Sequence, residues 1–250
     1  MNKKLLKCIP ICFFAVASIS NSASAEEEVK KFDIPGELSA NVSLASDYVF
    51  RGITQSDENP AIQGGLDWNY NIDKAWSANI GTWASNVDFN DGSEASTEID
   101  LYGGFGFSAN NWSFDVAATY YFYPGASDSL NYDYFEASAS VGYDFEVASL
   151  TAKAVYSPDN FGETGDASYY EIAAEVPLPY DFTLNAHYGH QEINDEVGFG
   201  VPDYNTWGVG IAYNIEGVDV GVNYIDTDIN KTDCADGCDA RVIFSVSKSL

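Results

Sequence analysis

Apolar and polar residues alternate along most of this chain, from Leu38 to the last residue. In a β-strand, successive side chains point to opposite faces of the sheet, so each alternating segment predicts a strand with one apolar and one polar face. The first such segment has an apolar face formed by Leu38, Ala40, Val42, Leu44, Tyr48 and Phe50. Helical periodicity is nearly absent, which favours an all-β fold.

Eleven further segments show the same alternation, at about 62–70, 76–80, 99–107, 112–122, 135–143, 150–156, 170–178, 182–188, 207–213, 218–224 and 242–250. The connections between the segments alternate in length: five are short turns and six are longer loops rich in Gly, Asp and Asn. Outer-membrane barrels have short periplasmic turns and long external loops. The pattern therefore predicts a transmembrane antiparallel up-and-down β-barrel of about 12 strands.

A secreted β-sandwich is the alternative, because its strands also alternate. The apolar faces carry no ionised residue before Lys248, whereas charges commonly protect the edge strands of sandwiches. Aromatic residues also gather at both ends of the apolar faces. At the turn end these are Tyr70, Trp76, Phe107, Trp112, Tyr143 and Tyr213, and at the loop end Tyr48, Phe50, Tyr120, Phe122, Tyr156, Tyr188 and Trp207. Two aromatic girdles around an aliphatic band favour the membrane barrel.

The N-terminus has three lysines, an apolar stretch at 9–19 and an Ala-Ser-Ala triplet. This pattern predicts a cleavable secretory signal peptide over residues 1–25. The apolar stretch is shorter than the roughly 20 residues that a spanning helix needs. We expect residues 26–35 to form a periplasmic segment and residues 36–250 to form the barrel.

The chain is strongly acidic, with a formal net charge of −27. Nucleic-acid binding requires a basic surface, so that class of partner is excluded. Acidity suits solubility in a salty medium or attraction of cations, and solvated loop carboxylates account for most of it. The expected partners are outer-membrane lipid and lipopolysaccharide of a Gram-negative bacterium, small solutes, and the barrel-assembly machinery during export.

Several sequence blocks are specific enough to compare with a known family. They are "SDYVFRGITQS", "PAIQGGLDW", "GTWASNVDF", "EIDLYGG", "VYSPDNFG", "HYGH" and "CDARVIFSVSKSL". Together they resemble the TorF family of proteobacterial outer-membrane porins, also designated Gcw_chp, and they cover nearly the whole mature chain. The resemblance implies an outer-membrane barrel with a channel role, and it implies no substrate. Barrels of this kind usually end in an aromatic residue, whereas this chain ends in Leu250.

The polar face of the predicted barrel carries the candidate pore-lining residues. The inward acids are Asp47, Asp67, Glu98, Asp100, Asp115, Glu136, Glu171, Glu175 and Asp219, and the inward bases are Arg51, Lys153 and Arg241. Arg51 and Arg241 would lie at the loop ends of the first and last strands, so we expect them close together at the external mouth. Few cations among many carboxylates could form a constriction that prefers cations. Alternatively, these residues form internal ion pairs that fill the barrel.

Twelve strands lie between the filled eight-stranded barrels and the open channels of 16 to 18 strands. Small inward residues are expected to leave room along the axis: Gly65, Gly81, Gly104, Gly106, Ala117, Gly142, Ala173, Gly208, Gly210, Ala212 and Gly221. The inward tyrosines either stack a sugar or base or simply fill space: Tyr102, Tyr121, Tyr123, Tyr134 and Tyr169. The favoured function is passive diffusion of small cationic or neutral solutes. The alternative is a non-conducting barrel that acts as an adhesin or structural protein through its external loops.

An enzyme is a remote alternative. His187 and His190 are three residues apart, which places them on opposite faces of a strand, and neither lies in a recognisable nucleophile motif. We therefore predict no catalytic residue, no metal site and no cofactor. Cys234 and Cys238 are predicted to form a disulfide in the last external loop, since two cysteines are too few for a structural zinc site. A homo-oligomer is compatible with the pattern, but nothing marks a subunit interface.

Overall fold

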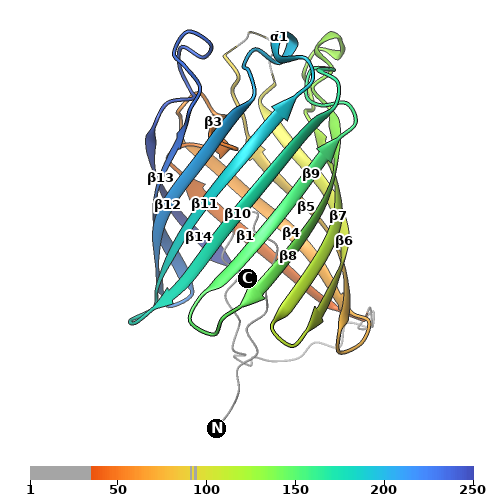
Figure 1. Ribbon diagram of the computed structural model, residues 1–250, viewed down its shortest axis with the longest axis vertical. Helices are drawn as coiled ribbons and strands as arrows, with labels where there is room; N and C mark the ends of the chain where they lie inside the picture. The colour runs from red at the N-terminus through yellow and green to blue at the C-terminus, as the bar shows by residue number, and fades with distance from the viewer. Residues whose placement is uncertain (1–34, 91, 93–94) are drawn as a thin grey trace, which may run out of the picture.

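The computed structural model describes residues 35–90, 92 and 95–250. The expected signal peptide and the expected periplasmic segment, apart from Pro35, lie outside the described residues. Twelve tilted strands form one closed antiparallel barrel, in which each strand pairs with its neighbours along the chain (Figure 1). The first strand pairs with the last, so the barrel has no edge strand. The predicted fold class is confirmed.

The barrel strands are β1 (Glu37–Ala45), β4 (Ala61–Asn71), β5 (Trp76–Asn86), β6 (Thr97–Ala109), β7 (Trp112–Phe122), β8 (Tyr134–Asp144), β9 (Ser149–Ser157), β10 (Ala167–Leu178), β11 (Phe182–Ile193), β12 (Tyr204–Ile215), β13 (Val218–Thr227) and β14 (Arg241–Ser249). A separate two-stranded sheet is formed by β2 (Val49–Phe50) and β3 (Ile53–Thr54). The helical segments are the 3-10 turn η1 (Asp128–Leu130) and α1 (Glu196–Phe199). No helix in the described part of the chain is long and apolar enough to cross a membrane.

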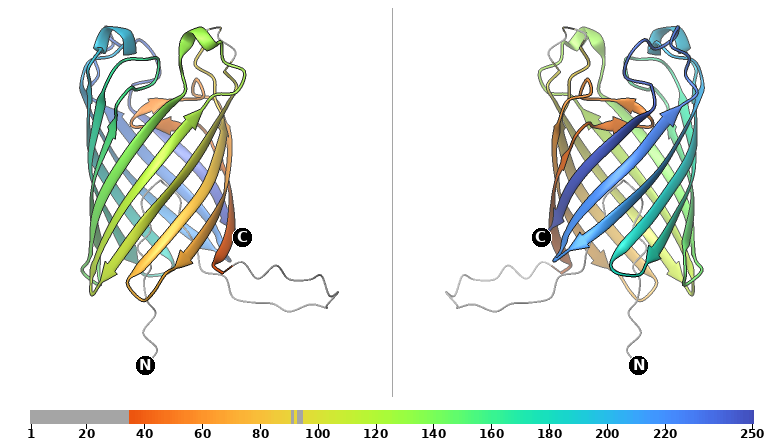
Figure 2. Two further views of the ribbon diagram at one scale, coloured as in Figure 1. Left: turned by 90° about the vertical axis from the view of Figure 1, so that its right-hand side faces the viewer. Right: turned by 90° about the vertical axis from the view of Figure 1, so that its left-hand side faces the viewer.

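Short turns and long connections lie at opposite ends of the barrel, here called the turn end and the loop end (Figures 1 and 2). The outer surface between them is apolar: Leu66, Ile80 and Phe105 each expose more than half of their surface. Aromatic rings pair between neighbouring strands at the turn end: Trp76 with Phe107, Trp112 with Tyr143, and Phe182 with Tyr213. An apolar outer band with an aromatic border is typical of barrels that are surrounded by the hydrocarbon chains of a lipid bilayer.

The first strand differs from the prediction. β1 ends at Ala45, and the chain leaves the wall until β4 begins; within this stretch β2 and β3 lie inside the barrel (Figure 2). Tyr48 and Phe50 therefore do not belong to the outer aromatic girdle: Tyr48 is only 9% exposed and Phe50 is half-buried. The alternation continues past the true end of the strand because the inserted segment contains a hairpin, whose strands have the same period of two.

Candidate functional site in the barrel lumen

A hairpin crosses the lumen near the loop end. It consists of β2 and β3 with their flanking residues, and residues 47–56 are called the lumen hairpin from here on. Figure 2 shows its two strands, in orange, between the walls of the barrel. Its two-residue turn is Arg51-Gly52, and both residues have positive φ, at 48° and 89°. This is the turn geometry that matches the twist of a tight hairpin.

The base of the lumen hairpin is fixed by one carboxylate. Asp47 accepts hydrogen bonds from the hydroxyls of Thr54 at 2.6 Å and Ser56 at 2.9 Å. It also pairs with Arg241 of β14, with 2.8 Å between Oδ2 and Nη1. Asp47 and Arg241 are both buried in this contact, since their side chains are only 8% and 11% exposed. The base of the lumen hairpin therefore contains a buried carboxylate, that of Asp47, whose charge is neutralised by Arg241.

The middle of the lumen hairpin packs against β5, β6 and β7. The hydroxyl of Tyr48 donates to Oε1 of Glu98 at 2.7 Å, and its ring centroid lies 5.3 Å from that of Trp83. The ring of Phe50 contacts that of Tyr121 at 5.9 Å in an edge-to-face arrangement. Burial raises the pKa of Tyr48, so its hydroxyl stays protonated and keeps donating to Glu98.

The tip of the lumen hairpin reaches β8, on the far side of the barrel from β1. The Nη2 atom of Arg51 lies 2.8 Å from both carboxylate oxygens of Glu136, and Nη1 donates to Gln191 of β11 at 3.0 Å. The guanidinium also lies over the ring of Tyr169, 4.5 Å from its centroid. Burial is the largest single influence and lowers the pKa of Arg51, but Glu136 and the neighbouring tyrosine hydroxyls together outweigh burial, and the net direction is upward. Arg51 therefore remains charged, and it fastens the hairpin to the wall through an ion pair and a cation–π contact.

The turn also touches the remaining side of the wall. A Cβ atom on Gly52 would clash with the side chains of Thr227 and Thr206, so only glycine allows the hairpin to approach β12 and β13 this closely. Thr206 and Thr227 are both buried, at 0% and 8% exposure. The lumen hairpin therefore contacts the wall on several sides at this level.

The turn-end half of the lumen is constructed differently. Here a side chain from one strand lies over a glycine of the next strand: Tyr102 covers Gly81, and Asn223 covers Gly210. The Tyr102 hydroxyl is bonded to Asp67, which holds the ring in that position. At these two inward glycines the neighbouring side chain occupies the space that a Cβ atom would take. That the small inward residues leave room along the axis stays a prediction.

All the predicted pore-lining residues of the wall have inward parity. Several of them have hydrogen-bond partners within the wall: Glu171 accepts from the hydroxyl of Tyr169 at 2.8 Å, and Asp219 from the side-chain amide of Asn214 at 2.7 Å. Glu136 likewise accepts from the hydroxyl of Tyr121 at 3.0 Å, and Asp67 from that of Tyr102. Lys153 is the direct neighbour of Glu171 in the pairing of β9 with β10. The other inward acids on the strands are Glu98, Asp100, Asp115 and Glu175. Their part in conduction stays a prediction.

The expected position of Arg51 at the end of the first strand is wrong. The chain has left the wall by that point, and the two arginines have separate partners: Arg51 pairs with Glu136, and Arg241 pairs with Asp47 and, at 3.4 Å, with Glu58. Inward arginines therefore hold the lumen hairpin at its two ends, a role that strand parity does not reveal.

Sequence reasoning missed Gln191, Trp83 and the two threonines that receive the hairpin. Their inward parity on β11, β5, β12 and β13 is readable from the alternation. Their contacts with the lumen hairpin could not be predicted from the alternation. These contacts depend on where the hairpin lies, and the hairpin is not paired with any strand of the wall. The one local signal was glycine after Arg51, at the second position of a tight turn.

The two histidines and two cysteines are placed as expected. His187 faces inward and His190 outward on β11. The sulfur atoms of Cys234 and Cys238 lie at disulfide distance, 2.04 Å apart, in the connection between β13 and β14. Within the described residues, no group of three His, Cys, Asp or Glu side chains is placed to hold a metal ion.

Comparison with known proteins agrees with this architecture. A family model described as "Bacterial protein of unknown function (Gcw_chp)" matches residues 30–250. None of the curated proteins matches the chain in sequence.

Many solved structures, among them the following three, are similar to this chain in fold. The first is the KdgM porin in complex with disordered oligogalacturonate, with 6% identity over 85% of this chain and 98% of that chain and a TM-score of 0.53. The NanC porin has 10% identity over 86% and 99% of the two chains and a TM-score of 0.52. An outer membrane channel from Pseudomonas putida F1 has 11% identity over 89% and 99% and a TM-score of 0.53. At these identities the likeness establishes the fold alone.

Proposed function

We propose a function for this chain from the premise that it belongs to the bacterial Gcw_chp family. The proposed function is that of a porin-type channel of the outer membrane, which the lumen hairpin narrows at the loop end. The observation that carries the proposal is the contrast inside the barrel. One half is crossed by a fastened hairpin, while side chains lie against the wall in the other. The resemblance to TorF porins supports the same function.

The charges of the lumen support passage of small cationic or neutral solutes. Arg241 and Arg51 neutralise Asp47 and Glu136, so neither arginine is free to attract an anion. The other inward carboxylates outnumber Lys153, and a surplus of one sign in a narrow, low-dielectric passage favours ions of the opposite sign. Solutes would diffuse between the lumen hairpin and the wall without chemical change.

The proposed location follows from the outer surface and the N-terminus. An apolar band of strands bordered by aromatic rings suits the bilayer, and the N-terminal pattern suits export through a cleaved signal peptide. The barrel would then contact lipid and lipopolysaccharide of the outer membrane and would be inserted by the barrel-assembly machinery.

A second candidate is a non-conducting barrel whose external loops are its working part. The observation that favours it is the extent of the lumen hairpin, which contacts the wall from β5 round to β14. Some outer-membrane barrels are indeed plugged by their own loops. The two candidates differ in whether the seated hairpin leaves a path for ions.

Single-channel current of the refolded protein in a planar bilayer separates the two. It should be measured under a salt gradient, beside a variant in which residues 49–54 are replaced by a short Gly-Ser linker. We expect a small, steady, cation-preferring current from the native chain and a severalfold larger one from the variant. Circular dichroism and heat-modifiable electrophoretic migration establish that both are folded. A silent native chain with a conducting variant would favour the plugged barrel, and two silent folded proteins would refute the channel.

A further inference from the structure

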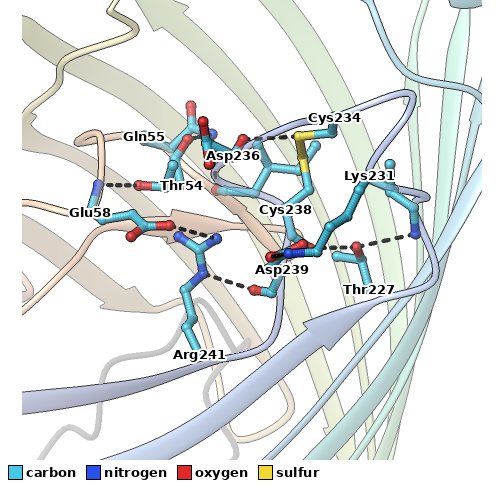
Figure 3. Close-up of a disulfide and its surroundings, with 12 residues drawn as sticks. Thr54, Gln55, Glu58, Thr227, Lys231, Cys234, Asp236, Cys238, Asp239 and Arg241 are labelled. Carbon is cyan, nitrogen blue, oxygen red and sulfur yellow. Dashed lines mark hydrogen bonds and ion pairs between the residues drawn. A yellow bond between two sulfur atoms is a disulfide. The ribbon is translucent and has the colours of Figure 1, made fainter.

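The connection between β13 and β14, residues 228–240, contacts the lumen hairpin directly (Figure 3). The carbonyl of Gly237 accepts a hydrogen bond from the backbone N–H of Thr54 in β3 at 2.9 Å. Gly237 has a φ of 88°, and a Cβ atom there would lie 2.7 Å from Cγ2 of Thr54. Gly237 lies between Cys234 and Cys238, so the segment that the disulfide closes is the one bonded to the hairpin.

The same segment makes apolar contact with the lumen hairpin. Cys238 is only 2% exposed and lies in a buried cluster with Ile193, Val201 and Tyr204. Ile53 of β3 packs against this cluster. Cys234 also packs against this cluster, so both cysteines of the disulfide belong to the apolar group of residues that contacts the hairpin.

Further contacts fix both ends of the segment: at its N-terminal end, the backbone N–H of Cys234 donates to the carbonyl of Asn230 at 3.0 Å. The Thr227 hydroxyl donates to the Cys238 carbonyl at 2.7 Å, and Nε of Arg241 donates to the Asp239 carbonyl at 3.1 Å. Residues 235 and 236, between the cysteines, are exposed. The crosslink therefore restricts the backbone that places the Gly237 carbonyl against Thr54, since a disulfide limits the conformations of the loop that it closes.

We propose that the Cys234–Cys238 segment is a thiol-sensitive clamp that holds the lumen hairpin in the barrel, so that reduction of this disulfide loosens the hairpin and widens the pore. The widening rests on the proposed channel function, whereas the clamp itself does not.

The chemistry is thiol–disulfide exchange with a small external thiol. Its thiolate attacks Sγ of Cys234, the less buried of the two sulfurs, and Sγ of Cys238 leaves as a thiolate. A second molecule of the thiol then attacks the mixed disulfide and releases Cys234. Two electrons and two protons pass to the protein, which gains two thiols, and the two reductant molecules become one disulfide.

The test compares the refolded full-length protein before and after addition of dithiothreitol to the loop-end side of a planar bilayer. Hydrogen exchange of the peptide that contains residues 49–54 is measured in parallel, and alkylation of the thiols shows how much disulfide has been reduced. We expect reduction to give a severalfold increase in current and faster exchange of this peptide.

Two variants sharpen the test. Cys234→Ser/Cys238→Ser should have the raised current and exchange without reductant, and dithiothreitol should not change either. Lys231→Ala is the matched control in the same connection, because its ion pair with Asp239 is solvent-exposed. It should behave like the native chain, including its response to dithiothreitol.

The outcomes distinguish the clamp from the channel. Complete reduction with unchanged exchange in residues 49–54 overturns the clamp, whatever the current does. Faster exchange in a protein that conducts neither before nor after reduction supports the clamp and refutes the channel. Faster exchange with an existing but unchanged current overturns the widening of the pore.

Discussion

The two halves of the lumen are formed by the same strands in opposite ways. In the turn-end half, contacts are between adjacent strands, as where Tyr102 of β6 lies over Gly81 of β5. In the loop-end half, the decisive contacts join distant parts of the chain: Arg51 meets Glu136 and Gln191, 85 and 140 residues away. The wall alone would be a tube, and in the proposed channel a single inserted segment would set its narrowest point.

The largest effect is expected from Arg51→Ala. The substitution leaves Glu136 without its partner in a contact where the two side chains are only 11% and 6% exposed. Breaking a buried ion pair by removing one partner costs about 3 kcal/mol. That corresponds to roughly a hundredfold loss in the ratio of seated to released hairpin. We expect a larger, noisier single-channel current and faster hydrogen exchange over residues 49–54.

The double variant Arg51→Met/Glu136→Leu is the control for the ion pair. Apolar residues of similar volume often replace a buried pair without loss of stability, so this variant should regain most of the native current and exchange protection. If Arg51→Ala has the native current and the native hydrogen exchange, the ion pair does not hold the lumen hairpin in place. The difference between the two halves of the lumen would then not depend on this ion pair.

The wall was predictable from the sequence because its outer face is apolar and its inner face polar, which imposes a period of two on every strand. Asp67, Asp115 and Asp219 could be assigned to the interior by counting positions from apolar neighbours. The turns and loops followed from the same count, because they are the places where the alternation breaks.

The lumen hairpin was not predictable by that route. Alternation reports which environment a side chain meets, but it does not report whether the segment lies in the wall or crosses the lumen. Tyr48 and Phe50 meet an apolar environment inside the barrel, formed by Trp83 and Tyr121, and so they resemble lipid-facing residues. The ion pairs of Arg51 and Arg241 depend on this insertion, which is why both arginines were assigned the correct side but Arg51 the wrong neighbours.

A smaller, conditional effect is expected from Gly81→Val, which tests the turn-end half. The new side chain would displace the Tyr102 ring from the wall toward the axis. While the lumen hairpin sets the narrowest point, the current should change little. In the variant with residues 49–54 replaced, the same substitution should lower the current clearly.

Ala118→Val is the matched control, since it enlarges an outward-facing residue of β7. It should leave the current unchanged in both backgrounds. If Gly81→Val reduces the current of the otherwise native chain as strongly as that of the hairpin-replaced variant, the narrowest point lies in the turn-end half and the assignment of the two halves is reversed.

The smallest effect is expected from the triple substitution Asp67→Asn/Asp115→Asn/Asp219→Asn. It removes three inward charges from the wall and keeps the side-chain shape and one carbonyl acceptor at each position. If the lumen is the proposed aqueous channel, these charges act over roughly 10 Å at 0.1 M salt, so the measurement is the reversal potential at about that concentration.

We expect the reversal potential of this triple variant to move toward zero, because cation preference weakens, with little change in total current. Asp226→Asn is the control: it removes a carboxylate that accepts from the hydroxyl of Tyr224 on the outward face of β13, and it should not shift the potential. If Asp226→Asn shifts the reversal potential by the same amount, the electrostatic field that gives cation preference lies at the loop-end rim of the barrel. No shift from the triple variant, with the native chain cation-selective, would place selection at the lumen hairpin, where Glu98 and Asp100 of β6 are the remaining inward carboxylates nearby.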